Sequence, residues 1–264
     1  MTDSKYLKDE IDEICRMDPN ADKDLLRQGA ADGSLACTLM LREASLMESD
    51  KVKALDYTRQ AARLGDPRCM YHVAVIDFAN GDYDEAYKWM RRAYINDIEE
   101  ASFGLARMSA YGLGTARDLE QASLYMEQAY ACDAEPDQRE KLNGYIEEQL
   151  AAKEYQAGNV CQAMERLRRI NTVNGWLLLA VIDTKNRKSC LEKAVDLDDP
   201  EASYLLALME TDKKRAFRLL KNAAKAGWTA AYEPLAECYE KGDGVSPNAE
   251  EARRWHEAAK NHHE

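Results

Sequence analysis

The sequence predicts an all-α protein built from consecutive helix pairs, and three observations support this prediction. The 264 residues include only 13 glycines and 6 prolines, whereas alanine, leucine, glutamate and other strong helix formers are abundant. Small residues recur in pairs, seven positions apart, along most of the chain. A second pattern, a bulky residue followed directly by an alanine, alternates with these pairs.

The paired small residues mark the second helix of each unit, called helix B below. A step of seven residues is two helical turns, so both members lie on one face of one helix. In most units a large residue follows the first member by three positions, for example Tyr57, Trp89 and Trp255, where it can fill the groove beside a close helix contact. The pairs are Ala54 and Ala61, Ala86 and Ala93, Ala122 and Ala129, Ala163 and Ile170, Ala216 and Ala223, and Ala252 and Ala259.

The dyads of a bulky residue and an alanine mark the first helix of each unit, called helix A. They are Val73 with Ala74, Leu105 with Ala106, Leu179 with Ala180, Leu206 with Ala207, and Leu235 with Ala236. Each unit is therefore helix A, a short link and helix B. Cys37 and Cys69 occupy the small position at the start of helix A and are predicted to be core residues.

Taken in order along the chain, these units predict about eight helix pairs. The first pair is expected over residues 4–17 and 22–32, and the last over 229–241 and 248–262. A helix over 137–156 is expected to be longer than the others. It follows a weak link at 131–136, which is the predicted site of a bend.

Two links carry clear helix-stop and helix-start signals. Gly112 and Gly114, like Gly242 and Gly244, follow helix A, where glycine can adopt the left-handed conformation that ends a helix. Asp118 and Asn248 are the predicted caps of the following helices B. Gln121 and Glu251 stand three residues beyond these caps, the spacing of a capping box.

The C-terminal unit carries the most specific pattern in the chain. Its residues are Ala223, Ala224, Gly227, Ala231, Leu235, Ala236, Tyr239, Gly242, Gly244, Asn248, Ala252, Trp255 and Ala259. Residues 93–130 repeat it with Ser109 in place of the tyrosine. The pattern resembles the Sel-1-like repeat family, a relative of tetratricopeptide arrays.

This resemblance implies a right-handed α/α solenoid superhelix of about eight helix pairs. It extends over residues 1–264 as a single solenoid and is degenerate in 134–194. Family members act as adaptors or scaffolds and rarely do chemistry, so the resemblance implies a non-enzymatic protein.

Composition and motifs exclude several other classes. A net charge of −12 argues against nucleic-acid binding, and the longest apolar run, residues 176–182, is too short to cross a membrane. The start of the chain has no secretory signal, and the seven cysteines form no CxxC pair, so we expect free thiols in the cytoplasm. We expect no catalytic residue, cofactor or metal site. A hydrolase or penicillin-binding enzyme of the cysteine-rich branch of the family would need two cysteines in each repeat.

The candidate binding residues come from the expected position of helix A on the concave side. Residues two and six positions after the first small residue of helix A point outward if the helical phase is right. They are Tyr71, Val75, Phe103, Arg107, Tyr204, Leu208, Glu233 and Glu237. Aromatic and arginine side chains are typical interface anchors. A phase error of one residue would instead place this set in the core.

These observations lead to the hypothesis of an acidic, monomeric scaffold that binds a protein or peptide on its concave face. An acidic surface steers basic partners, so a basic partner is favoured over a membrane or nucleic acid. An alternative hypothesis is an immunity protein that neutralises a bacterial antagonism toxin.

Overall fold

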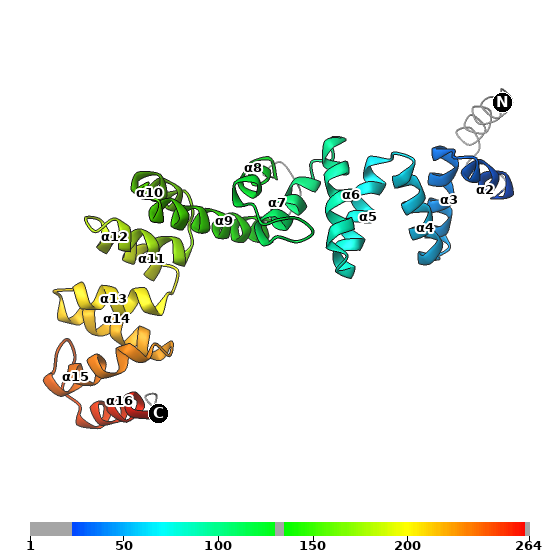
Figure 1. Ribbon diagram of the computed structural model, residues 1–264. Coiled ribbons are helices and arrows are strands. Elements are labelled where there is room, and N and C mark those ends of the chain that lie inside the picture. The colour runs from blue at the N-terminus through cyan, green and yellow to red at the C-terminus, as the bar shows by residue number, and fades with distance from the viewer. Residues whose placement is uncertain (1–22, 130–134, 262–264) are drawn as a thin grey trace. The chain divides into compact units, whose positions relative to one another are not determined.

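The computed structural model describes residues 23–129 and 135–261 (Figure 1). Over these residues the chain forms 15 α-helices and one short 3₁₀-helix, without any β-strand. It divides into two compact units, residues 1–142 and residues 143–264. The boundary falls inside the longest helix, α9 (Pro136–Gln156).

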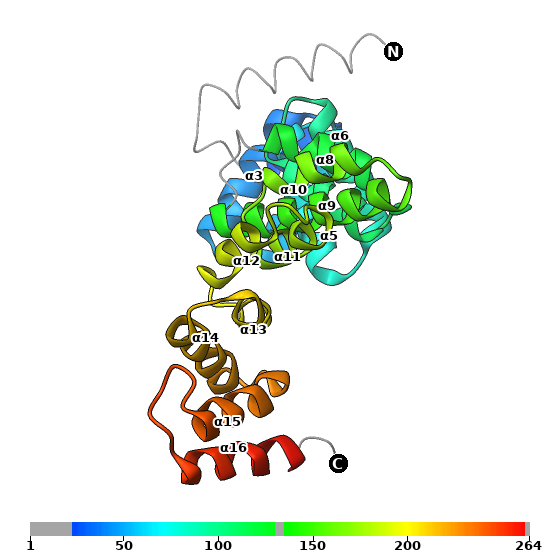
Figure 2. The same ribbon diagram turned by 90° about the vertical axis from the view of Figure 1, so that its left-hand side faces the viewer.

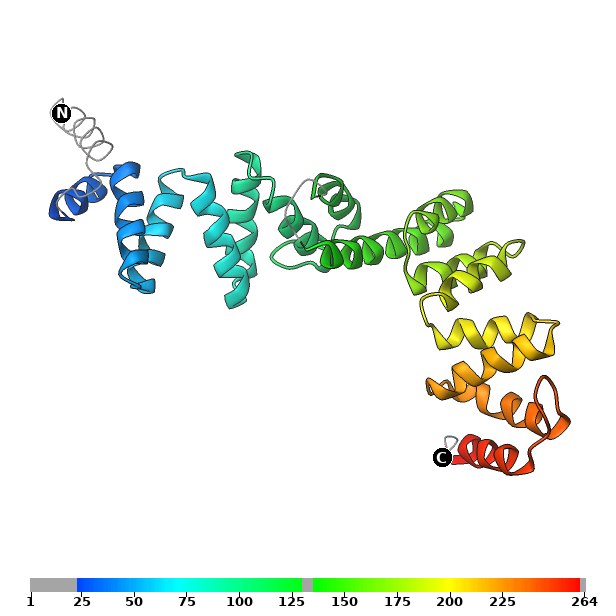
Figure 3. The same cartoon turned by 180° about the vertical axis from the view of Figure 1, so that it is seen from behind.

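Unit 1 contains α2 (Lys23–Ala31), three complete helix pairs and the start of α9. The pairs are α3 (Leu35–Met47) with α4 (Lys51–Arg63), α5 (Pro67–Asn80) with α6 (Tyr83–Ile95), and α7 (Ala101–Tyr111) with α8 (Leu119–Ala129). The two helices of a pair pack against each other, and helix B also packs on helix A of the next pair. Figure 3 displays the same succession from behind.

Unit 2 contains the rest of α9, then α10 (Val160–Arg168) and three further pairs. The pairs are α11 (Val173–Ile182) with α12 (Arg187–Val195), α13 (Pro200–Met209) with α14 (Lys213–Lys225), and α15 (Tyr232–Lys241) with α16 (Ala249–Asn261). A 3₁₀ turn, η1 (Thr229–Ala231), precedes α15. The helices from α13 to α16 follow one another as successive layers (Figure 2).

The arrangement confirms the predicted all-α fold of consecutive helix pairs. The long helix expected over 137–156 is α9, with 21 residues. The last pair agrees with η1, α15 and α16. The helix expected over 4–17 and positions 131–134 of the expected bend lie outside the described residues.

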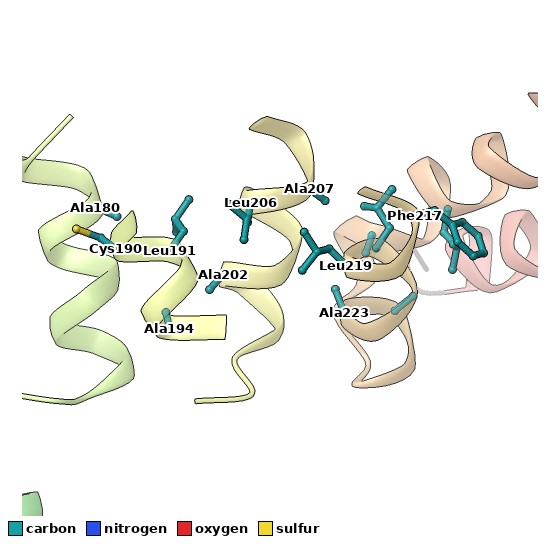
Figure 4. Packing of buried hydrophobic residues seen from close by; sticks show 14 of the residues in the cluster. Ala180, Cys190, Leu191, Ala194, Ala202, Leu206, Ala207, Phe217, Leu219 and Ala223 are labelled. Atoms are coloured by element: carbon teal, nitrogen blue, oxygen red, sulfur yellow. The ribbon is translucent and has the colours of Figure 1, made fainter. Parts of the chain in front are cut away.

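The core is made mainly of alanines and leucines that face one another across neighbouring helices. All the dyad residues of helix A are buried, and so are the paired small residues of helix B except Ala216. On α14 the neighbouring Phe217 takes the core position, with its ring edge-on to Tyr239 at 5.2 Å between centroids. Figure 4 shows Ala194, Ala202 and Ala223 in this layer, beside larger residues such as Leu191 and Leu206. Small residues thus let the helices approach while leucines fill the remaining space. The prediction that Cys37 and Cys69 are core residues is also confirmed, since both are fully buried.

The two glycine links share one geometry, and in it each link touches the preceding repeat. Gly112 and Gly242 end helix A in the left-handed region, with φ of 70° and 74°. A Cβ on Gly114 would lie 2.0 Å from the carbonyl oxygen of Tyr83, and a Cβ on Gly244 would lie 2.1 Å from that of Lys213. These oxygens belong to the first residues of α6 and α14. The second glycine is therefore required by the approach of the preceding helix B.

The predicted caps are confirmed, whereas the reciprocal half of the predicted capping box is wrong. Asp118 accepts a hydrogen bond from the amide of Gln121 at 2.9 Å, and Asn248 accepts one from the amide of Glu251 at 3.1 Å. The amides of the two cap residues donate to the carbonyl oxygens of Ser109 and Tyr239, each at 2.9 Å. Because the loop folds back onto helix A, these amides are already satisfied and Gln121 and Glu251 are not needed.

Three of the pairs without a glycine link place an acidic residue near the end of helix A. Asp77 on α5, Asp183 after α11 and Glu210 after α13 stand eight residues beyond the first small residue of helix A, and their side chains are almost fully buried. Each carboxylate pairs with a base on the preceding helix B. The pairs are Arg59 with Asp77 at 2.6 Å, Arg168 with Asp183 at 2.9 Å, and Lys188 with Glu210 at 3.1 Å. Consecutive repeats are thus joined by a charge pair.

Candidate binding surface

The eight predicted surface residues all lie outside the buried core. Val75 and Leu208 are 44% and 59% exposed, and Glu233 and Glu237 are also exposed. Tyr71, Phe103, Arg107 and Tyr204 are half-buried. The helical phase used for the prediction is therefore right. The residues directly before them, such as Met70, Ser102 and Ser203, are the ones that belong to the core.

In unit 1 the outward residues come from α5 and α7, which are helices A of consecutive pairs. The guanidinium carbon of Arg107 lies 4.0 Å from the ring centroid of Phe78, so a side chain of α7 covers one of α5. The Phe78 ring in turn meets Tyr83 edge-on at 5.1 Å. This contact makes the outward faces of α5 and α7 continuous.

In unit 2 the outward face is apolar on α11 and α13. Tyr204 and Leu208 on α13 have counterparts on α11, namely Leu177 and Val181, of which Val181 is 60% exposed. The sequence-based prediction missed this second pair. The same count of two and six positions, started from the buried Gly175, would have found it.

On α15 the outward face changes from apolar to acidic. Glu237 pairs with Lys241 on the same helix, whereas Glu233 and Glu240 contact the two ring nitrogens of His256 on α16 at 3.0 and 3.1 Å. Hydrogen bonds to these two carboxylates raise the pKa of His256 above its ordinary value, although partial burial opposes the shift. Glu233, Glu240 and His256 line an open cleft of about 960 Å³ between α15 and α16.

The described residues include no group of three or more histidine, cysteine, aspartate or glutamate side chains that could hold a metal ion. Burial raises the pKa of the Cys69 thiol to about 12, so this sulfur stays protonated and weakly nucleophilic at neutral pH. Within the described ranges, no helix is both long and apolar enough to cross a bilayer.

Helix pairs stacked through a small-residue core, with the helices A of each unit presenting side chains outward, define a helical repeat protein. The profile of the Sel1 repeat matches residues 35–66, 69–97, 99–133, 200–228 and 230–262, which together make up more than half of the chain. The chain belongs to the Sel1 repeat family. Proteins of this family are generally protein-interaction scaffolds and typically lack catalytic activity. The unmatched stretch between residues 133 and 200 includes the segment that the sequence predicts to be degenerate.

Solved structures of repeat proteins resemble the chain at low sequence identity. A Sel1 repeat protein from Oxalobacter formigenes aligns with a TM-score of 0.51 and 19% identity, over 91% of this chain and 86% of that protein. The protein c5321 of uropathogenic Escherichia coli, described as a protective antigen with an SLR fold, aligns with a TM-score of 0.47 and 18% identity, over 90% of this chain. The alignment spans 63% of the length of that antigen. No curated protein sequence matches the chain significantly. The likeness to the Oxalobacter protein supports the solenoid fold and nothing further.

Proposed function

We propose that this chain is a non-catalytic scaffold that holds a protein or peptide segment along the outward face of its helices A. The observation that carries the proposal is the apolar surface on α11 and α13, the helices A of consecutive pairs, where Val181 and Leu208 are 60% and 59% exposed at equivalent positions. Exposed apolar side chains that are aligned across neighbouring elements are typical of interaction surfaces. Burial against a partner would remove them from water, which is the main favourable term in association.

Charge favours a basic segment in the partner. Glu233 and Glu237 lie on α15 at the positions that correspond to Tyr204 and Leu208 on α13, and the whole chain carries a net charge of −12. Acidic groups beside an apolar surface accelerate the association of a basic partner and discriminate against acidic ones. The proposed partner segment therefore has apolar anchors for α11 and α13 and basic side chains for α15.

The test begins with proteins that co-purify with the tagged chain from its native cells, identified by mass spectrometry. The affinity of the purified partner is then measured for the wild type and for Leu208→Lys, Val181→Lys and Tyr204→Ala. We expect each lysine variant to weaken binding at least tenfold, because a charge replaces an apolar contact.

The matched control is Ile95→Lys, since Ile95 is 66% exposed on α6, a helix B. This variant should bind like the wild type. Equal affinity for the wild type, Leu208→Lys and Val181→Lys would contradict the proposed surface.

A further inference from the structure

Arg107 is a cation for which the described part of the chain provides no counter-charge. It forms no hydrogen bond or ion pair there, and its Nε atom is shielded from solvent without an acceptor. Asp77, which precedes Phe78, pairs with Arg59 through Oδ1, whereas its Oδ2 is buried without a hydrogen-bond partner. Two other half-buried arginines contact carboxylates: Arg166 contacts Glu147 and Glu154, and Arg59 contacts Asp77. Arg107 thus differs from Arg59 and Arg166 in having no carboxylate partner among the described residues.

Stacking holds Arg107 ready for a ligand. Its guanidinium carbon is 4.0 Å from the centroid of the Phe78 ring, a geometry that favours a parallel cation–π contact and limits rotation of the side chain. Nε is shielded from solvent without an acceptor, whereas the two terminal nitrogens are not. These two nitrogens form the fork that binds both oxygens of a carboxylate. Because the side chain is already partly ordered, little further conformational entropy is lost on binding.

The surroundings of Arg107 indicate what accompanies the carboxylate. Phe103 precedes it by one turn on α7, and Val75 on α5 is 44% exposed. Tyr111, at the end of α7, is 49% exposed on the far side of Arg107 along the helix. Apolar groups thus stand on more than one side of the cation, so a bound segment continues past it instead of ending there.

We infer that Arg107 receives an aspartate or glutamate side chain of the partner segment, flanked by apolar residues that cover Val75, Phe103 and Tyr111. This inference rests on the proposed function, since α7, like α11 and α13, is a helix A. It adds a site in unit 1 with the opposite charge preference to α15 in unit 2.

The probe is an amidated, fluorescein-labelled peptide of about ten residues with leucines around one central glutamate, compared with a matched peptide that carries glutamine. We expect wild-type protein to bind the glutamate peptide at least tenfold more tightly in low salt. Arg107→Met should abolish this preference, and Arg107→Lys should keep only part of it, because lysine retains the charge without the fork. Arg91→Met on α6 is the matched control and should retain the full preference.

If binding is weak, it is measured by NMR from the Nε–H signal of Arg107. This signal is assigned by its absence from the spectrum of Arg107→Lys. A saturable shift with the glutamate peptide but not with the glutamine peptide supports the inference. No shift up to millimolar peptide, or a glutamate preference that survives in Arg107→Met, overturns it. A glutamine peptide made with a free C-terminal carboxylate is a further comparison. If this peptide binds through Arg107 and the amidated glutamate peptide does not, the inference is also overturned, because the ligand is then a chain end.

The two proposals fail separately. If Leu208→Lys and Val181→Lys leave partner affinity unchanged, the scaffold surface in unit 2 is wrong whatever Arg107 does. If those variants weaken binding but the glutamate preference is absent, only the inference about Arg107 is wrong.

Discussion

The glycine-linked pairs and the acid-linked pairs hold the end of helix A against the preceding helix B by different physical means. In α7–α8 and α15–α16, Gly114 and Gly244 lie against the backbone carbonyl groups at the start of α6 and α14. In α5–α6, α11–α12 and α13–α14, a buried carboxylate binds a base of the preceding helix B. The first device depends on the absence of a side chain, and the second on a charge pair. The difference teaches that a repeat without the glycine link keeps this contact through a charge pair instead of through close backbone packing.

The largest expected effect comes from Gly244→Ala. The alanine would combine a φ of 77° with a Cβ 2.1 Å from the Lys213 carbonyl oxygen, so backbone has to move. We expect a loss of about 4 kcal/mol in unfolding free energy, from the sum of left-handed strain and overpacking. Urea denaturation measures it, and hydrogen exchange should localise the loss to α15 and α16.

The matched control for Gly244→Ala is Gly227→Ala. Gly227 has a φ of 88°, but a Cβ added there would meet no neighbouring atom within 4 Å. Gly227→Ala should therefore lower the unfolding free energy only by the strain of a left-handed alanine, about 1 kcal/mol. Equal losses for the two substitutions would show that the contact with α14 is unimportant.

The next effect is expected for Arg59→Met in an acid-linked pair. Removing the guanidinium leaves Asp77, whose side chain is 3% exposed, as a buried charge without its ion-pair partner. The expected cost is about 3 kcal/mol. Denaturant midpoints should show that the double substitution Arg59→Met with Asp77→Leu recovers much of the stability lost in Arg59→Met, because no buried charge is then left unpaired. Arg63→Met, at an exposed position of α4, is the control and should change stability little. An equally large loss for Arg63→Met would contradict the role of the pair.

A smaller effect is expected for the helix caps. Asn248→Ala removes the acceptor for the amides of Glu250 and Glu251, which should cost about 1 kcal/mol. Asp82 precedes α6 in an acid-linked pair and forms no side-chain cap bond, so Asp82→Ala should cost only a few tenths of a kcal/mol. Similar losses for both variants, measured by thermal unfolding, would show that the cap hydrogen bonds to Asn248 do not stabilise α16.

The smallest effect is expected on how the unfolding free energy depends on pH, through the buried carboxylates of the acid-linked pairs. A hydrogen bond from Lys188 lowers the pKa of Glu210, although desolvation opposes the shift. The stabilisation is therefore present above the ordinary glutamate pKa of about 4.3 and is lost as the pH falls through the lower folded-state value. Urea midpoints between pH 6 and pH 3 should decline less steeply for Glu210→Gln than for the wild type. Glu127→Gln, at an exposed position, should follow the wild-type curve. If both variants follow that curve, Glu210 makes no such contribution.

Much of the surface could be predicted because it follows from helical geometry alone. Once the first small residue of helix A is known, the positions two and six residues later must point away from the core. The prediction missed Leu177 and Val181 because they lie in the degenerate part of the chain, where Gly175 was not recognised as the starting residue. The partners of Arg59 and Arg107 could not be found in this way, since they lie on other helices.

The sequence by itself determined the helices, their order, their caps and their buried faces, because these depend on residues within one or two helical turns of one another. Only the tertiary structure decided why Gly114 and Gly244 must be glycine, which base neutralises Asp77, and that Arg107 stacks on Phe78 without a carboxylate. These contacts join residues from 18 to 31 positions apart or depend on how one helix packs on the next. Helical periodicity carries no information about such packing, because it describes each helix separately.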